Sequence, residues 1–160
     1  MNQTTSAPMN DEHSNQGVIV IVDDTPHNLG VLFDFLTDSG FRVLVAQDGQ
    51  SALQKVEYAK PDLILLDVMM PGIDGFETCR RLKANPATRD IPVLFLSALS
   101  DAVDKVKGFN LGAVDFITKP VQQEEVKARV TTHLALRNLQ KRLEEQNLQL
   151  QAEIQERQRA

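Results

Sequence analysis

The sequence has little cysteine and no long hydrophobic run, and each scarcity excludes a class of protein. A single cysteine, Cys79, excludes a disulfide framework and any zinc or iron–sulfur site built from several cysteines. Uninterrupted apolar runs such as Val18–Val22 and Leu63–Leu66 are far shorter than the roughly 20 residues of a membrane span. The N-terminus has no basic patch followed by an apolar stretch, so no targeting signal is indicated. We therefore expect a soluble, cytoplasmic protein that does not bind membranes.

Positive charge is also scarce. The chain has 17 Lys and Arg against 22 Asp and Glu, a formal net charge of −5 at pH 7. Nucleic-acid binders usually carry a basic surface, so direct binding of nucleic acid is not expected. The length of 160 residues suits one domain with an appendage, and it is enough to bury a core without disulfides.

The chain divides into a polar start and a patterned remainder. Residues 1–16 are polar and aperiodic, which predicts a disordered tail. Several of the later apolar runs show no alternation, which is typical of strands covered on both faces. The runs that predict strands are Val18–Val22, Arg42–Ala46, Leu63–Val68, Val93–Ser97 and Val114–Thr118.

Amphipathic segments separate these strands. One helix is expected to begin at Pro26, a residue favoured in the first turn, and to stop at Gly40, while a second ends at Pro61. The apolar residues that mark the four helices are Leu29, Leu32, Phe33 and Leu36; Ala52, Val56 and Ala59; Phe76, Cys79 and Leu82; and Val103, Val106 and Leu111. Repeated strand–helix alternation indicates right-handed βαβ units on one parallel sheet. The prediction is an α/β doubly wound domain over residues 17–134.

The last segment lacks proline and glycine from Val121 to Arg159, so one continuous helix is expected there. Its length would be about 58 Å at 1.5 Å per residue. A domain of about 115 residues has a radius of gyration of about 13–14 Å, so such a helix cannot stay docked along its whole length. We expect residues 135–160 to project as an extension.

This extension carries a partial heptad pattern. Leu136, Leu139, Leu143 and Leu150 fall on an a/d seam, and Gln146 occupies one d position. The pattern favours a two-stranded coiled coil that joins two chains as a homodimer and connects to an output. A solvated single helix that frays stays open as the alternative, because three heptads with a polar interruption are marginal alone.

Polar residues end four of the five predicted strands. Asp23 and Asp24 follow the first strand, Asp67 ends the third, Ser97 the fourth and Lys119 the fifth. Ligands of open parallel sheets bind beyond the carboxyl ends of the strands. We therefore expect these five residues to share one site.

The chemistry of this site follows from its charges. Three carboxylates about 5 Å apart repel by roughly 3 kcal/mol per pair at an effective dielectric constant of 20, so either one is protonated or a cation lies among them. Oxygen ligands without histidine or cysteine favour a hard divalent ion, above all Mg²⁺. Carboxylate, Mg²⁺, lysine and hydroxyl together suit phosphoryl transfer. The sequence has no glycine-rich phosphate loop, so a nucleotide is not the obvious donor.

These motifs together resemble the receiver domain of bacterial two-component response regulators. The motifs are Val20–Val22 with Asp23-Asp24, Leu65-Leu66-Asp67-Val68-Met69-Met70-Pro71-Gly72 with Asp74-Gly75, Leu96-Ser97-Ala98, and Asp115-Phe116-Ile117-Thr118-Lys119-Pro120. They follow the family's order and spacing, and the resemblance covers about Val18 to Leu134. It implies a flavodoxin-like fold with strand order 2-1-3-4-5.

The resemblance also implies roles for the acidic residues. Asp67 would be the phosphoacceptor, receiving the phosphoryl group from a histidine kinase or phosphotransfer protein. Asp24 would bind Mg²⁺ directly with Asp67, Asp23 would bind it mostly through water, and the backbone carbonyl of Met69 would complete the protein ligands. The chain would catalyse only its own phosphorylation and dephosphorylation.

The remaining motif residues would contact the phosphoryl group or change position in response to it. Lys119 would pair with the phosphoryl oxygens. The peptide bond from Lys119 to Pro120 would be cis. Ser97 would hydrogen-bond the phosphoryl group, and Phe116 would be the switch aromatic, with a plain core role as its alternative. Phosphorylation would then alter the output face and the C-terminal helix dimer, which control a missing or separate output domain.

Several residues and alternatives remain to be placed. Met69 and Leu99 are apolar where many relatives carry polar residues, which predicts slow dephosphorylation. Cys79 is expected in the core, His133 in packing or at the surface, and Asp74-Gly75 at a helix start. A small Mg²⁺-dependent phosphatase or phosphotransferase, and a phosphate-independent dimerisation scaffold, are the alternative functions. The first lacks a general acid two residues after Asp67 and a cap domain.

Overall fold

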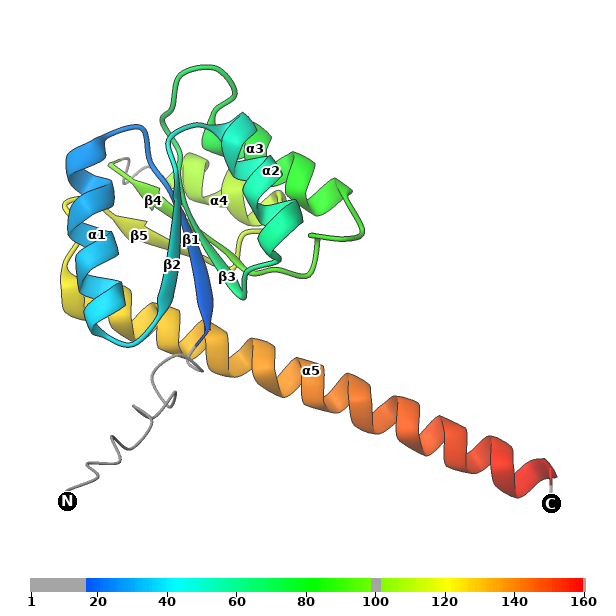
Figure 1. Cartoon of the computed structure of the whole chain (residues 1–160). Helices are drawn as coiled ribbons and strands as arrows, with labels where there is room; N and C mark the ends of the chain where they lie inside the picture. Colours follow the sequence, from blue (N-terminus) through cyan, green and yellow to red (C-terminus); the bar gives the residue numbers. More distant parts are fainter. Residues whose placement is uncertain (1–16, 99–101, 160) are drawn as a thin grey trace, which may run out of the picture.

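Five parallel strands form a single sheet in the order β2-β1-β3-β4-β5 (Figure 1). The computed structural model of the chain describes residues 17–98 and 102–159. The predicted tail at residues 1–16 and the predicted rim residue Leu99 lie outside this part. The strands are β1 Val18–Val22, β2 Arg42–Ala46, β3 Leu63–Asp67, β4 Val93–Ser97 and β5 Asp115–Thr118. The predicted doubly wound fold and strand order are confirmed.

Helices cover both faces of the sheet (Figure 1). α1 and α5 lie on one face, and α2, α3 and α4 lie on the other. The helices are α1 Pro26–Asp38, α2 Gly49–Ala59, α3 Gly75–Ala84, α4 Ala102–Asn110 and α5 Gln123–Arg159.

The apolar strands are continuous in sequence because both of their faces are buried. In β1, Ile19 and Ile21 pack toward α1 and α5, while Val20 and Val22 pack toward α2 and α3. Every residue of β3 and β4 is buried. Burying an aliphatic side chain contributes about 1.5–3 kcal/mol, so these central strands dominate the core. Burial of these strands also fixes the positions of the residues at their ends.

Helix starts follow the expected chemistry. Pro26 lies in the first turn of α1, and the side chain of Asp48 caps α2 by accepting a hydrogen bond from Ser51 N at 2.8 Å. The Asp74 carboxylate caps α3 in the same way, from Glu77 N at 2.8 Å. The predicted helix start at Asp74-Gly75 is confirmed, and Cys79 is fully buried on the inner face of α3 as expected.

Two strand ends and some apolar residues differ from the pattern. Val68 and Val114 continue the hydrogen bonding of their strands by one bond each, to Leu96 O and Val93 O, but β3 ends at Asp67 and β5 begins at Asp115. The apolar residues that mark the helices are not all buried, because the apolar face of a helix is wider than the part of it that packs on the sheet. The exposed ones include Phe33 on α1 and Val103 and Val106 on α4.

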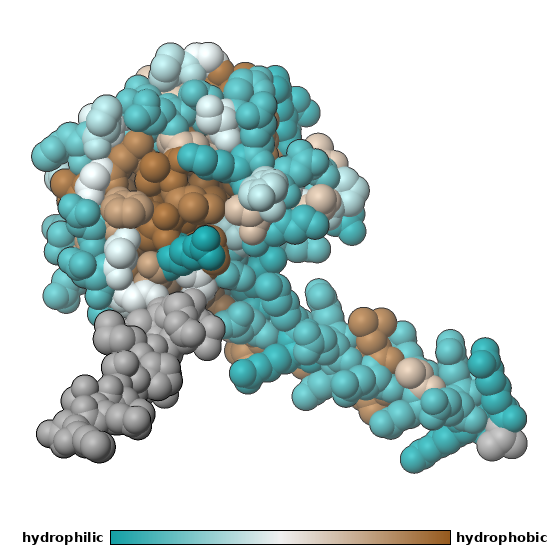
Figure 2. Space-filling model, in the orientation of Figure 1, coloured by the Kyte–Doolittle hydropathy of each residue, from teal (hydrophilic) through white to brown (hydrophobic). Residues whose placement is uncertain are grey.

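The C-terminal helix is continuous and leaves the domain, as predicted (Figure 1). It begins at Gln123, two residues after the expected Val121, and Leu134 is the last of its residues described as buried. Beyond it the helix surface is mostly hydrophilic with separate apolar patches (Figure 2). The leucines at 136, 139, 143 and 150 are each at least half exposed. No helix in residues 17–98 and 102–159 is both long and apolar enough to cross a membrane.

Candidate phosphoacceptor site

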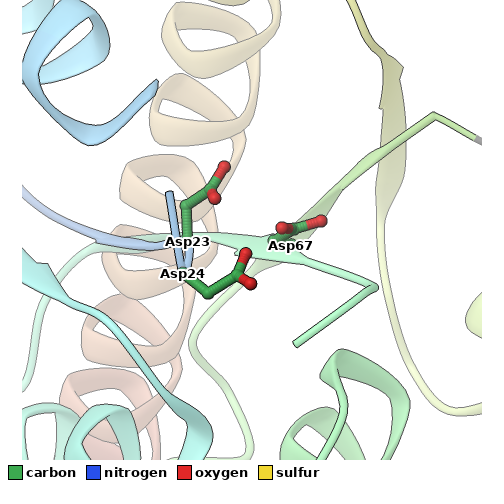
Figure 3. Close-up of side chains that lie close together, drawn as sticks. All are labelled: Asp23, Asp24 and Asp67. Carbon is green, nitrogen blue, oxygen red and sulfur yellow. The ribbon is translucent and has the colours of Figure 1, made fainter. Parts of the chain in front are cut away.

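Three carboxylates meet at the carboxyl edge of the sheet (Figure 3). Asp23 and Asp24 follow β1, and Asp67 ends the neighbouring β3, with Val22 paired to Leu66 in the register. One oxygen from each carboxylate lies within 4.8 Å of the others. Parallel neighbours bring their carboxyl ends to the same place, so the expected juxtaposition of these acids is present in the structure.

Lys119 lies between the two buried acids. Its Nζ is 3.0 Å from Asp23 Oδ2 and 3.1 Å from Asp67 Oδ2. The lysine follows β5, and its backbone N–H donates to Ser97 O at 2.8 Å, which continues the β4–β5 pairing. The lysine predicted for this edge thus holds two carboxylates that are 44 residues apart in sequence. The peptide bond from Lys119 to Pro120 is cis, as the resemblance implied.

Local turns aim the other oxygens of these acids. Asp23 Oδ1 accepts a hydrogen bond from Thr25 N at 2.9 Å, and Asp67 Oδ1 accepts one from Met69 N at 3.3 Å. Aspartates commonly bond the backbone two residues ahead in this way. Each buried carboxylate therefore has one oxygen held by its own turn and one held by Lys119.

The site carries more negative charge than its lysine neutralises. Asp23 and Asp67 are almost fully buried, whereas Asp24 is exposed. Burial and the neighbouring Asp23 carboxylate raise the pKa of Asp67 to about 6, against the lowering effect of Lys119. Burial alone would lower the pKa of Lys119, but its contacts with the two carboxylates raise it. Three carboxylates and one ammonium leave a net charge of −2 when all are ionised.

This donor set fits a hard divalent cation. The grouped ligand atoms are carboxylate oxygens, with no histidine or cysteine among them. Asp24 opens the cluster to solvent, so an ion has a path of entry. A dication would balance the excess charge that Lys119 leaves.

A glycine lets α3 approach the strand that carries Asp67. Gly75 N donates to Val68 O at 2.9 Å, and a Cβ on Gly75 would lie only 2.1 Å from Asp67 O. A side chain here would therefore force the backbone of the site apart. The Asp74-Gly75 pair predicted only a helix start, because a long-range backbone contact leaves no local pattern.

Ser97 and Phe116 lie inside the fold on the β4–β5 side of the site. Ser97 is buried at the end of β4, paired in register with Thr118. The Phe116 ring is buried, with its centroid 5.2 Å from that of Phe95 and 5.4 Å from that of Phe109. The ring thus occupies an inward position, which agrees with a core role and leaves the switch role as a prediction.

Met69, two residues after Asp67, is 64% exposed. Its backbone, in contrast, is tied to Asp67. The predicted restriction of water by Met69 stays a prediction.

His133 lies elsewhere. Its Nε2 is 3.0 Å from Asp115 Oδ2 on β5, so the side chain has a packing role in a polar cluster, as expected. This cluster also contains Arg129, whose Nη1 is 2.6 Å from Asp115 Oδ1.

A groove of about 520 Å³ opens beside the carboxylates, a feature that the sequence pattern did not predict. Its lining includes Asp23 and Lys119, and the rest comes from α1, from the end of β4 and from the segment after β5. Val31, Leu32 and Val121 contribute apolar surface. A partner that reaches Asp67 would meet this apolar surface next to the charged site.

Comparisons with known proteins agree with this geometry. The family model described as the response regulator receiver domain matches residues 19–131. The chain is 46% identical to the response regulator PleD of Caulobacter vibrioides over 112 residues, 70% of this chain and 25% of the relative. It is 39% identical to a probable cyclic di-GMP phosphodiesterase of Vibrio cholerae over 146 residues, 91% of this chain and 33% of the relative. The chain thus spans a quarter to a third of these two relatives.

Solved structures give the same picture. A putative response regulator from Chloroflexus aurantiacus is 37% identical with a TM-score of 0.71, covering 74% of this chain and 98% of that one. The receiver domain of the sensor histidine kinase PA1611 from Pseudomonas aeruginosa is 28% identical with a TM-score of 0.70, over 74% and 98% of the two chains. That structure has a magnesium ion coordinated in its active-site cleft.

Proposed function

Because the chain belongs to the response regulator receiver domain family, a signalling family of two-component systems, we propose that Asp67 is its phosphoacceptor. The donor would be a histidine kinase or a phosphotransfer protein. The observation that supports this proposal is the position of the Asp67 carboxylate, buried between Asp23 and Lys119 at the end of a central strand. As an acceptor for such donors, the chain would act in the cytoplasm.

The reaction requires a carboxylate nucleophile. One oxygen of Asp67 attacks the phosphorus of a phosphohistidine, the P–N bond breaks, and its electron pair stays with the imidazole nitrogen, which takes up a proton. Lys119 already contacts Asp67 and lies where it can pair with a phosphoryl oxygen. Ser97, at the end of the adjacent β4, would donate its hydroxyl to another oxygen.

Mg²⁺ is proposed as the cofactor. Asp23, Asp24 and Asp67, together with the backbone carbonyl of Met69, would hold the ion, and the three grouped carboxylates support this assignment. When bound, Mg²⁺ neutralises charge on the phosphoryl oxygens and on the carboxylates. Lys119, which contacts Asp23 and Asp67, would supply further positive charge.

The response would pass from β4 and β5 to the last helix. A phosphoryl group adds nearly two negative charges at Asp67, which would bias the positions of Ser97 and Phe116 and the surface formed by α4, β5 and α5. The half-exposed leucine stripe of α5 supports a homodimer through that helix. The alternative is a single solvated helix. A measurement of the oligomeric mass of the intact chain distinguishes it from the homodimer.

The output is proposed to be a catalytic domain joined or docked through α5. The match to the Vibrio cholerae relative covers 146 of the 160 residues, so it must include part of the projecting helix. That relative is a probable cyclic di-GMP phosphodiesterase by name. A helix shared with such a protein supports a connector role, whereas the chain itself would catalyse only its own phosphorylation and dephosphorylation.

The test is phosphorylation by a small phospho-donor with Mg²⁺, read as intact mass. The unmodified sequence is expected to gain one phosphoryl group, and Asp67→Asn is expected to gain none. Asp34→Asn, an exposed acid on α1, is the matched control and should be modified normally. Equal modification of Asp67→Asn would contradict the proposal. Turnover of sugar phosphates by the unmodified protein would favour the phosphatase alternative.

A further inference from the structure

Two basic residues tie α5 to the domain beyond the buried part of the helix. Leu134 is the last described residue of α5 that is buried. Nearly one turn later, Arg137 donates a hydrogen bond from Nη1 to the backbone carbonyl of Asp90. One further turn along, Lys141 Nζ lies 3.5 Å from Asp62 Oδ1. These three positions share one side of the helix, so the contact with the domain runs well past Leu134.

Both attachment points lie just before strands of the sheet. Asp62 directly precedes β3, and its Oδ2 accepts a hydrogen bond from Val18 N, the first residue of β1, at 2.9 Å. Asp90 lies in the loop before β4, next to buried Ile91. Lys83 Nζ holds this loop by donating to Ile91 O at 2.7 Å. The helix is therefore anchored beside the amino edge of the sheet, on segments that hydrogen bonds hold in place.

We propose that Arg137 and Lys141 form a basal clamp that sets the direction of the projecting helix. The clamp joins α5 to the amino ends of β3 and β4, the two strands whose carboxyl ends carry Asp67 and Ser97. The site and the helix exit are thus connected through two strands whose residues are all buried. This inference rests on these contacts and does not require that Asp67 be phosphorylated.

The clamp lengthens the base on which the helix rests. From Val126 to Leu134 the buried base is about 12 Å long at 1.5 Å per residue, and extending it to Lys141 gives about 22 Å. If the sideways displacement at each end of the docked segment stays the same, the angular spread of a stiff helix is inversely proportional to the length of that segment. The clamp is therefore expected to reduce the swing of the helix roughly twofold. Residues 142–159, about 27 Å long, project beyond it.

The clamp also decides which way the leucine stripe faces. At about 100° per residue, the side with Arg137 and Lys141 lies about 150° around the helix from the side with Leu136, Leu139 and Leu143. The stripe therefore points away from the domain, and its side chains are 50–59% exposed. A second chain packed along it would not collide with the receiver to which the helix belongs.

A distance measurement within one chain tests the clamp. Spin labels would be placed at Thr37→Cys on α1 and Gln151→Cys on α5, both exposed positions. The native Cys79 is buried, and its pKa is raised to about 11 by burial, so it stays unlabelled. Mixing with an excess of unlabelled chain leaves only distances within one chain. The result is therefore independent of whether two copies pair.

The double variant Arg137→Gln/Lys141→Gln is expected to broaden the distance distribution about twofold. Arg142→Gln is the control for loss of a positive charge, because it removes one such charge next to Lys141 and Arg142 has no hydrogen bond or ion pair within the described residues. Its distribution should match the unmodified chain. An unchanged width in a folded double variant would overturn the proposal.

A second variant keeps the test independent of folding defects. Asp62→Asn removes the charge that faces Lys141 but keeps a side-chain oxygen for Val18 N. It is expected to give a smaller broadening, because an ion pair this exposed is weak on its own and the Arg137 bond remains. High salt should reproduce this partial broadening in the unmodified chain. If neither Asp62→Asn nor salt changes the width, the contribution of Lys141 to the clamp is refuted.

Discussion

The ring of Phe116 fills the space that a side chain on Gly108 would need. A Cβ at Gly108 would lie 2.4 Å from Phe116 Cζ and 3.1 Å from Phe95 Cε2. The glycine of α4 therefore permits the inward position of the ring. This contact connects α4 to β5, two of the elements through which we propose that phosphorylation is transmitted.

Replacing Gly108 by alanine should push the Phe116 ring from this position. Alanine favours helix over glycine by about 1 kcal/mol, but disturbing the two ring contacts of Phe116 costs about 0.5–1.5 kcal/mol each. We expect Gly108→Ala to lower the free energy of unfolding by between zero and about 2 kcal/mol in denaturant unfolding. Its phosphorylation should be normal, with smaller NMR shifts of α4 and β5 amides on modification.

Gly30→Ala is the matched control for this effect. Gly30 lies in α1, and a Cβ there would meet nothing within 4 Å. It should stabilise the protein by about 1 kcal/mol, the gain in helix propensity alone. If Gly108→Ala gave the same stability gain and a full NMR response, the proposed coupling of α4 to Phe116 would be wrong.

Magnesium should stabilise the folded chain through the carboxylate cluster. At a free concentration 100 times the dissociation constant, binding to the folded state alone adds about 2.7 kcal/mol to the free energy of unfolding. The exposed Asp24 can be changed to Asn with little effect on folding, and Asp24→Asn should lose most of this gain. The measurement is the thermal midpoint with and without Mg²⁺. Asp38→Asn, an exposed acid at the end of α1, should respond like the unmodified chain.

A side chain at Gly75 should distort the phosphoacceptor loop. The nearest atoms to a Cβ there are the Asp67 carbonyl oxygen at 2.1 Å and Val68 Cα at 2.8 Å, and backbone cannot yield as a side-chain tip can. We expect Gly75→Ala to lower the free energy of unfolding by about 3 kcal/mol, the upper part of the range for overpacking. Urea unfolding would measure this loss, and an unaltered midpoint would show that α3 can move away without cost.

Asp115 should give the protein a stability term that is lost in acid. Burial alone would raise the pKa of Asp115, but hydrogen bonds from His133 and Arg129 hold it below its usual value. A lowered carboxyl pKa stabilises the fold above the unfolded-state pKa of about 3.9, and this stability is lost as the pH falls through the folded-state pKa. Asp115→Asn should therefore cost about 1 kcal/mol at neutral pH, a modest value because the pairs are partly exposed.

The pH profile distinguishes this ion-pair effect from a general packing defect. The difference in unfolding free energy between Asp115→Asn and the unmodified chain should begin to shrink below about pH 4, and it should vanish only below the lowered pKa of the native Asp115 carboxyl, where that group also becomes neutral. Chemical unfolding at a series of pH values would measure it. A difference that stayed constant into that acid range would show that the charge of Asp115 contributes nothing.

Much of the fold could be predicted from local sequence patterns. β1, β2 and β4 have the bounds that their apolar runs predict, because both sheet faces are buried and no alternation interrupts them. The grouping of Asp23, Asp24 and Asp67 could also be predicted, since the order of parallel strands brings their ends together. Composition and spacing were enough to predict features that depend on a single strand or on a single edge of the sheet.

Contacts between distant segments could not be predicted in the same way. Nothing local indicates that Lys119 contacts both Asp23 and Asp67, or that Lys141 reaches Asp62 across 79 residues of sequence. Such contacts depend on how helices settle on the sheet, and therefore on the sum of many side-chain packings. The resemblance to a known family supplied the role of Lys119 but offered no equivalent for the clamp.

The two ends of β3 would have separate tasks under the two proposals. Asp67 lies at its carboxyl end, whereas Asp62, which receives Lys141, lies just before its amino end, about 16 Å away at 3.3 Å per residue. A phosphate donor and a partner held along α5 would thus occupy opposite poles of the molecule. Loading and unloading of the phosphoryl group can then proceed while the assembled complex stays intact, so one long-lived complex could follow a changing stimulus without dissociating.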